Sequence, residues 1–118
     1  MKLEVGMYVR LVNDVEDIVV INKIANVFET TILTENDGSI YQGEYTKENV
    51  VKASYNIIDI LEVGDYVNGK KVYSLGLTIG ILNTINFEDG TFTIAEDIKS
   101  IVTKEQFEQM AYRIGDDK

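Results

Sequence analysis

The side chains best suited to bind a ligand in this chain are two arginines and three nearby or repeated tyrosines. Arg10 and Arg113 are the only arginines among the 118 residues. A guanidinium group binds phosphate through two parallel N–H donors, and a tyrosine ring can stack on a base. Together with Tyr8, Tyr66 and Tyr112, the arginines predict a site for a small anionic, aromatic ligand. The alternative is a surface arginine and a helix-terminal charge that favours the helix dipole.

The composition excludes several kinds of catalysis. The chain has no histidine and no cysteine, so it cannot form a Ser-His-Asp triad, a Cys-His pair or the usual zinc site. Closely spaced acids such as Asp14 with Asp17, or Glu96 with Asp97, are able to bind Mg²⁺ in principle. On an acidic protein such residues are usually solvated surface groups. We therefore expect a protein that is not an enzyme and holds no metal and no cofactor.

The charge narrows the range of partners. Twenty acidic residues against eleven basic ones give a net charge of −9, which disfavours contact with a phosphate backbone, so we expect no direct nucleic-acid binding. A solvated surface explains the acidity, and mimicry of nucleic acid in the basic groove of an enzyme is the alternative. There is no run of 18 apolar residues and no signal-peptide start. We expect a cytoplasmic protein with no membrane contact.

One phrase occurs twice. Residues 3–9 (Leu-Glu-Val-Gly-Met-Tyr-Val) return as residues 61–67 (Leu-Glu-Val-Gly-Asp-Tyr-Val), identical at six of seven positions. Two shorter matches follow in the same order, 37–40 with 89–92 and 48–50 with 96–98. The phrase resembles the first strand of small SH3-like barrels. We expect a mainly β protein of two related SH3-like small-barrel modules, 1–58 and 59–118, packed as one unit because each alone would be marginal.

Turn residues divide these modules into strands. Asn68-Gly69 predicts a two-residue hairpin, because both positions of a type I′ turn need positive φ. Residues 35–38 and 88–90 predict two further hairpins. The alternation of the repeated phrase leaves open whether its valines or its tyrosine point inward. The chain contains no proline to guard the sheet edges, so edge pairing between chains predicts a homo-oligomer.

Only the end of the chain predicts a helix. Thr103 as the N-cap with Gln106 three residues later is typical of a capping box. Phe107, Met110 and Ile114 then recur at helical spacing, which predicts a C-terminal helix of about three turns with one buried face.

Three segments resemble small proteins carried by phages and prophages of Gram-positive bacteria. They are residues 52–59 (KASYNIID), 62–72 (EVGDYVNGKKV) and 97–107 (DIKSIVTKEQF). The resemblance implies a phage origin, and small acidic phage proteins without catalytic residues often act against host defence. Some, such as anti-Thoeris and anti-CBASS sponges, sequester a nucleotide signal, and others inhibit a nuclease complex.

The expected function is therefore noncatalytic anti-defence binding in the host bacterial cytoplasm. The partner would be a small nucleotide signal or a host defence protein, with sequestration of a nucleotide immune signal placed first. An anti-CRISPR-type inhibitor of a nuclease complex and a structural or accessory protein of the virion are the alternatives. A sponge needs a local basic and aromatic pocket, whereas a nuclease inhibitor needs a continuous acidic face.

Overall fold

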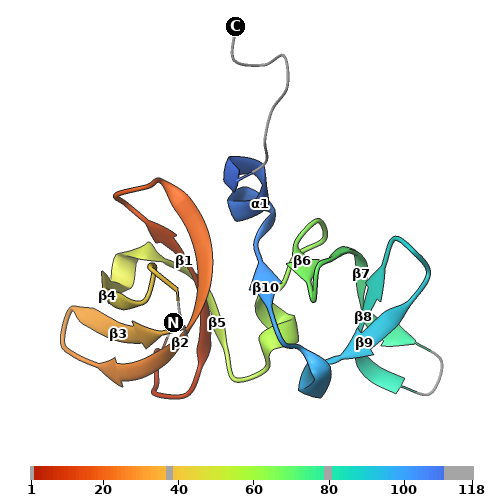
Figure 1. The fold of residues 1–118 in the computed structure, drawn as a ribbon. Helices are drawn as coiled ribbons and strands as arrows, with labels where there is room; N and C mark the ends of the chain where they lie inside the picture. Colours follow the sequence, from red (N-terminus) through yellow and green to blue (C-terminus); the bar gives the residue numbers. More distant parts are fainter. Residues whose placement is uncertain (1, 37–38, 79–80, 111–118) are drawn as a thin grey trace, which may run out of the picture.

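Two antiparallel sheets of five strands each make up most of the protein in a computed structural model that describes residues 2–36, 39–78 and 81–110 (Figure 1). The first sheet has the order β4-β3-β2-β1-β5. Its strands are β1 (Tyr8–Asn13), β2 (Ile18–Val27), β3 (Thr31–Glu35), β4 (Gly43–Thr46) and β5 (Val50–Ser54).

The second sheet repeats this arrangement. Its order is β10-β6-β7-β8-β9, which is the order of the first sheet read from the other end, with β6 in the place of β1. Its strands are β6 (Tyr66–Val67), β7 (Lys70–Thr78), β8 (Ile81–Phe87), β9 (Phe92–Ile94) and β10 (Ile101–Val102).

Short helices occupy related places in both halves. A 3₁₀ turn precedes the fifth strand of each sheet, η1 (Lys47–Asn49) before β5 and η3 (Ala95–Asp97) before β10. A second 3₁₀ turn, η2 (Ile57–Ile60), follows β5, and the helix α1 (Lys104–Met110) follows β10. Figure 1 shows β10, the edge strand of the second sheet, and α1 where the two sheets meet. We call this boundary between the two sheets the seam, and the end of the described chain lies at it.

The repeated phrase forms the same turn in both sheets. Gly6 and Gly64 have φ values of 94° and 98°, a region that glycine enters without a steric penalty. Gly6 donates its N–H to the Ile24 carbonyl over 2.9 Å, and Gly64 donates to the Val72 carbonyl over 3.0 Å. Each turn therefore joins its own first strand to the strand that pairs with it.

The turn also decides which side chains point inward. Val9 and Val67 are fully buried, whereas Val5 and Val63 are each 56% exposed, so the last valine of the phrase is the core residue in both copies. One core lies within the first sheet and contains Val9, Leu11, Ile18, Val20, Ile24 and Ile32. The second core contains Ile21, Ile58, Ile60, Leu61, Val67, Val72, Ile85 and Phe87. Because Ile21 lies on β2, the second core includes a residue from the face of the first sheet that points away from the first core.

The sequence predicted much of this fold. The mainly β content and the C-terminal helix are confirmed. Among the described residues the two sheets remain open and do not close into barrels. The Asn68-Gly69 hairpin is confirmed, with φ values of 53° and 81° at its two turn residues. The turn predicted at 35–38 includes residues 37 and 38, which lie outside the described residues.

The capping box is confirmed as well. The Gln106 N–H donates to Thr103 Oγ1 and the Thr103 N–H donates to Gln106 Oε1, both over 3.0 Å. The Thr103 hydroxyl also donates to the carbonyl of Val19 on β2 over 2.6 Å, so the cap fixes α1 to the first sheet. The described helix spans seven residues, and Ile114 of the predicted apolar face lies outside the described residues. Within the described ranges, no helix has the length and apolar character needed to cross a membrane.

The expectation of a buried Phe107 needs correction. Its side chain is 42% exposed, because it covers one face of Tyr66 at the protein surface. The two rings are stacked with centroids 4.0 Å apart and an interplanar angle of 17°.

Phe107→Ala should therefore lower the free energy of unfolding by about 1 kcal/mol, the scale of an aromatic pair, and not by the larger loss typical of a core phenylalanine. Urea unfolding of Phe107→Ala, Tyr66→Ala and the double variant would isolate the coupling between the rings. A loss above about 3 kcal/mol for Phe107→Ala would contradict a surface stack.

Candidate functional site

Arg10, the first candidate ligand residue, is buried at the seam between the two sheets. It alternates on β1 with Val9 and Leu11, which point into the first core, so its side chain leaves the opposite face of the strand. Only 1% of Arg10 is exposed. Its guanidinium donates to both carboxylate oxygens of Asp65, over 2.7 and 3.1 Å. It also donates to the Ile60 carbonyl over 3.2 Å.

Acidic side chains surround the remaining edge of this guanidinium. Glu105 Oε1 accepts from Arg10 Nη2 over 3.0 Å, and Glu62 Oε2 lies 3.5 Å from Nε. Burial by itself lowers the pKa of Arg10, but the hydrogen bond and charge of Asp65, with the two glutamates, outweigh it and raise the pKa. A guanidinium enclosed in this way holds the two halves together. The structure gives Arg10 a structural role in place of the ligand contact expected from the sequence.

Asp65 completes this buried pair. It is fully buried, and besides Arg10 it accepts from the N–H groups of Glu62 over 2.8 Å and Lys104 over 2.9 Å. A carboxylate with four donors is well satisfied, which is what allows a charge to be buried. Asp65 is also the one position at which the repeated phrase differs, since Met7 stands there in the first copy. That difference was the available sequence signal for the pair.

Glu62 connects the buried pair to two surface lysines. Its carboxylate lies 2.8 Å from Lys104 Nζ and 3.0 Å from Lys52 Nζ. The hydrogen bond from Lys104, followed by that from Lys52 and the charge of Arg10, lowers the pKa of Glu62 from 4.5 to about 2, although partial burial opposes the shift.

This lowered pKa predicts a pH-dependent stability. A carboxylate with a depressed folded-state pKa stabilises the fold fully above its unfolded value of about 4.5, and the contribution disappears as the pH falls towards 2. Because the lysines are partly exposed, we expect a contribution of only about 1 kcal/mol. The urea midpoint of Glu62→Gln should lie below that of the parent protein at pH 6 and approach it at pH 2.5. An equal difference at both pH values would contradict this assignment.

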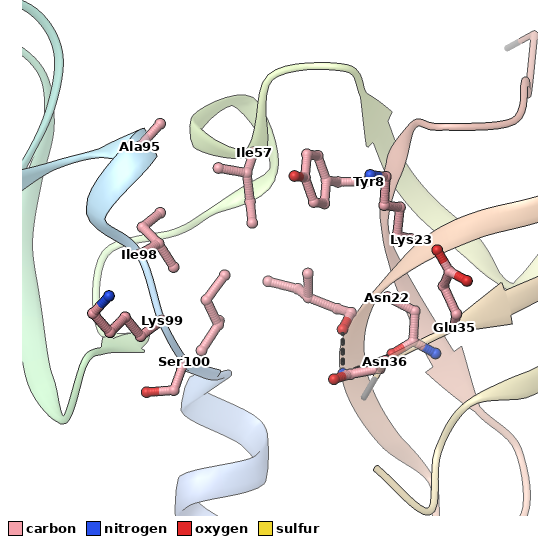
Figure 2. A pocket seen from close by; sticks show the side chains of 12 residues that line it. Tyr8, Asn22, Lys23, Glu35, Asn36, Ile57, Ala95, Ile98, Lys99 and Ser100 are labelled. Carbon is pink, nitrogen blue, oxygen red and sulfur yellow. Dashed lines mark hydrogen bonds between the residues drawn. The ribbon is translucent and has the colours of Figure 1, made fainter. Parts of the chain in front are cut away.

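A cavity of about 440 Å³ opens between the first sheet and the segment that leads into β10 (Figure 2). Four isoleucines and one alanine from both halves form its apolar lining: Ile21, Ile57, Ala95, Ile98 and Ile101. Polar and charged residues form the larger part of the lining: Tyr8, Asn22, Lys23, Glu35, Asn36, Lys99 and Ser100. A volume of roughly 300–1,000 Å³ is typical of small-molecule sites.

Tyr8, a predicted ligand residue, lines this cavity. Figure 2 shows its ring pointing from β1 towards Ile57 on the opposite wall. Lys23 is the cross-strand partner of Tyr8, and its ammonium lies over the Tyr8 ring, 5.6 Å from the centroid. One wall of the cavity thus has an aromatic ring with a cation over one of its faces.

Hydrogen bonds fix two asparagine side chains, Asn22 and Asn36, in the same wall of the cavity. Asn22 is buried and donates from Nδ2 to Thr34 Oγ1 and to the Tyr41 carbonyl, both over 3.0 Å. Asn36 donates from Nδ2 to the Ile21 carbonyl and to Asn22 Oδ1, both over 3.0 Å. These bonds engage both amide hydrogens of Asn36.

Tyr66, another predicted ligand residue, lies apart from the cavity. Tyr66 stacks on Phe107 of α1 and is not among the residues that line the cavity. Tyr112 and Arg113 lie outside the described residues. Sequence reasoning missed Lys23, because a cross-strand partner has no local signal, and it missed the isoleucine walls, which come from distant segments.

No group of three or more acidic side chains in the described part of the chain is placed to hold a metal ion. Comparison of the chain with protein-family models, with curated proteins and with solved structures finds no match.

Proposed function

We propose that this protein is a noncatalytic, phage-encoded binding protein that sequesters a nucleotide immune signal in the host bacterial cytoplasm. The cavity between the two sheets, with Tyr8 and Lys23 on one wall, is the observation that carries the proposal. A protein with a net charge of −9 repels anions except where a cation is locally concentrated. An aromatic ring beside such a cation favours a ligand that joins a base to a phosphate.

The proposal includes a fold of two SH3-like modules, 1–58 and 59–118, packed as one unit. The equal strand orders and the equal turns at Gly6 and Gly64 support a duplication. The buried pair of Arg10 and Asp65 supports a fixed seam between the modules. Ligand sites occur preferentially at such seams, because walls from two units enclose more ligand surface than one unit can.

Inhibition of a nuclease complex is the second candidate, favoured by the net charge of −9. An acidic protein surface can occupy a basic groove that normally holds nucleic acid. The edge strands of the two sheets could pair with those of another copy, which supports a homo-oligomer. A homo-oligomer would fit the third candidate, an accessory protein of the virion.

Native mass spectrometry of the protein purified from bacteria with an active nucleotide-signalling defence would test the first candidate. We expect a bound mass of nucleotide size that is absent when the signalling cyclase or synthase is deleted. Copurification of a nuclease subunit without any nucleotide would contradict nucleotide sequestration and support inhibition of a nuclease complex. A large ring without either partner would favour the virion role.

A further inference from the structure

We infer that the cavity takes a planar base carrying a single phosphate, as in a nucleoside monophosphate or a cyclic mononucleotide, and discriminates against polyphosphates. This inference rests on the proposed nucleotide binding and specifies the class of nucleotide. Three features of the cavity lead to it: the surroundings of Tyr8, the charges at its rim and its apolar walls.

The second sheet shows how the repeated tyrosine is covered. Tyr8 and Tyr66 occupy the same position of the repeated phrase, and each pairs across the strands with a lysine, Lys23 and Lys71. In the second sheet the ring of Phe107 stacks on Tyr66, 4.0 Å between centroids. In the first sheet Tyr8 borders the cavity instead. Because Lys23 lies over one face of the Tyr8 ring, a planar ligand ring would stack on the other face and make there the contact that Phe107 makes on Tyr66.

The charges at the rim limit the ligand to one phosphate. Lys23 lies on the same wall as Tyr8, but Glu35 is its cross-strand partner on β3 and also lines the cavity. Figure 2 shows the Lys99 side chain pointing away from the space between the walls. Lys23 and Glu35 are both exposed and their charges cancel, so the rim offers a phosphate one cationic contact but no excess positive charge. A second or third phosphate would find no further cation on this wall and would be repelled by an acidic protein.

The apolar walls fit a base better than a chain of phosphates. Ile57 and Ile98 lie across the cavity from Tyr8 (Figure 2), and Ile101 also lines it. A base inserted between isoleucines and a tyrosine buries its ring without leaving charged groups unsolvated. The phosphate would then remain at the rim next to Lys23, where water still reaches it.

Titration calorimetry with AMP, cyclic AMP, ADP and ATP at low ionic strength would test this inference. We expect AMP and cyclic AMP to bind at least about 10-fold more tightly than ATP, because each extra phosphate adds repulsion that the rim does not offset. Tighter binding of ATP would overturn the inference while leaving nucleotide sequestration in place. An absence of heat with all of these nucleotides and with cyclic dinucleotides would overturn the proposed function itself.

Substitutions at the wall separate the two contacts. Tyr8→Leu, which keeps an apolar side chain but removes the ring, should weaken AMP binding at least about 10-fold, and Tyr8→Phe should change it little. Lys23→Met should weaken AMP binding about 10-fold, whereas the matched Lys71→Met should not, because Lys71 is not among the cavity residues. Equal effects of Lys23→Met and Lys71→Met would place the phosphate elsewhere and overturn the inference. Unchanged thermal midpoints would show that each variant is folded.

Discussion

Asp65→Ala is expected to lower the free energy of unfolding by about 3–5 kcal/mol, the cost of leaving one member of a buried ion pair without its partner. Asp65 is fully buried, and it accepts two hydrogen bonds from Arg10 over 2.7 and 3.1 Å. The substitution would leave a buried guanidinium with only partial compensation from the glutamates at its edge. Urea unfolding at pH 7 measures the loss directly.

Two control variants show whether the loss of stability comes from the buried ion pair or from the removal of a charge in general. Glu29→Ala removes the same charge from an exposed position and should change stability by less than about 0.5 kcal/mol. The double variant Arg10→Met, Asp65→Asn should recover part of the loss, because no buried guanidinium is left without its partner and the amide oxygen still accepts from the N–H groups of Glu62 and Lys104. If Asp65→Ala were as stable as Glu29→Ala, the seam would not depend on this pair.

Asn68→Ala is expected to destabilise the protein by about 2 kcal/mol for two separate reasons. Asn68 has a φ of 53°, a conformation that costs alanine more than asparagine. Its side chain also holds the segment that forms one cavity wall: Oδ1 accepts from the N–H groups of Lys99 over 2.7 Å and Ser100 over 3.1 Å, and Nδ2 donates to the Asp97 carbonyl over 3.0 Å.

Glycine at position 68 separates the effect of the positive φ from the effect of the lost side-chain hydrogen bonds. Asn68→Gly relieves the backbone strain but loses the same side-chain hydrogen bonds, so it should lower the free energy of unfolding by about 1 kcal/mol. Urea midpoints of both variants give the comparison. Equal losses for alanine and glycine would show that the positive φ contributes nothing. Parent-like stability of both variants would show that the wall does not depend on Asn68.

Features encoded by neighbouring residues were predictable from the sequence. The turn at Asn68 and Gly69 and the cap formed by Thr103 and Gln106 each depend on residues at most three positions apart. The structure confirms both. Local backbone preferences are sufficient to predict such elements. The distant contacts that these residues also make, from Asn68 to residues 97–100 and from Thr103 to the Val19 carbonyl, had no local signal.

Features that depend on distant partners were not predictable. Arg10 meets Asp65 across 55 positions of the chain, so a sequence with two arginines indicated a ligand site where the fold places a structural ion pair. Tyr8 was identified through the repeat, but Lys23 and the isoleucine walls become neighbours only when the sheets pack. Phe107 kept its helical spacing, yet its partner is a half-exposed tyrosine and not the core.

The buried pair of Arg10 and Asp65 takes one charge from each half of the chain, so the two halves are complementary and cannot replace each other. Arg10 of the first half corresponds to Asn68 of the second, and Asp65 of the second corresponds to Met7 of the first. A chain with two first halves would enclose guanidinium groups without a carboxylate, and a chain with two second halves would enclose carboxylates without a cation. Either arrangement costs several kcal/mol per unpaired charge. Recombination between the repeats would therefore yield chains that are less stable than the parent chain by this amount.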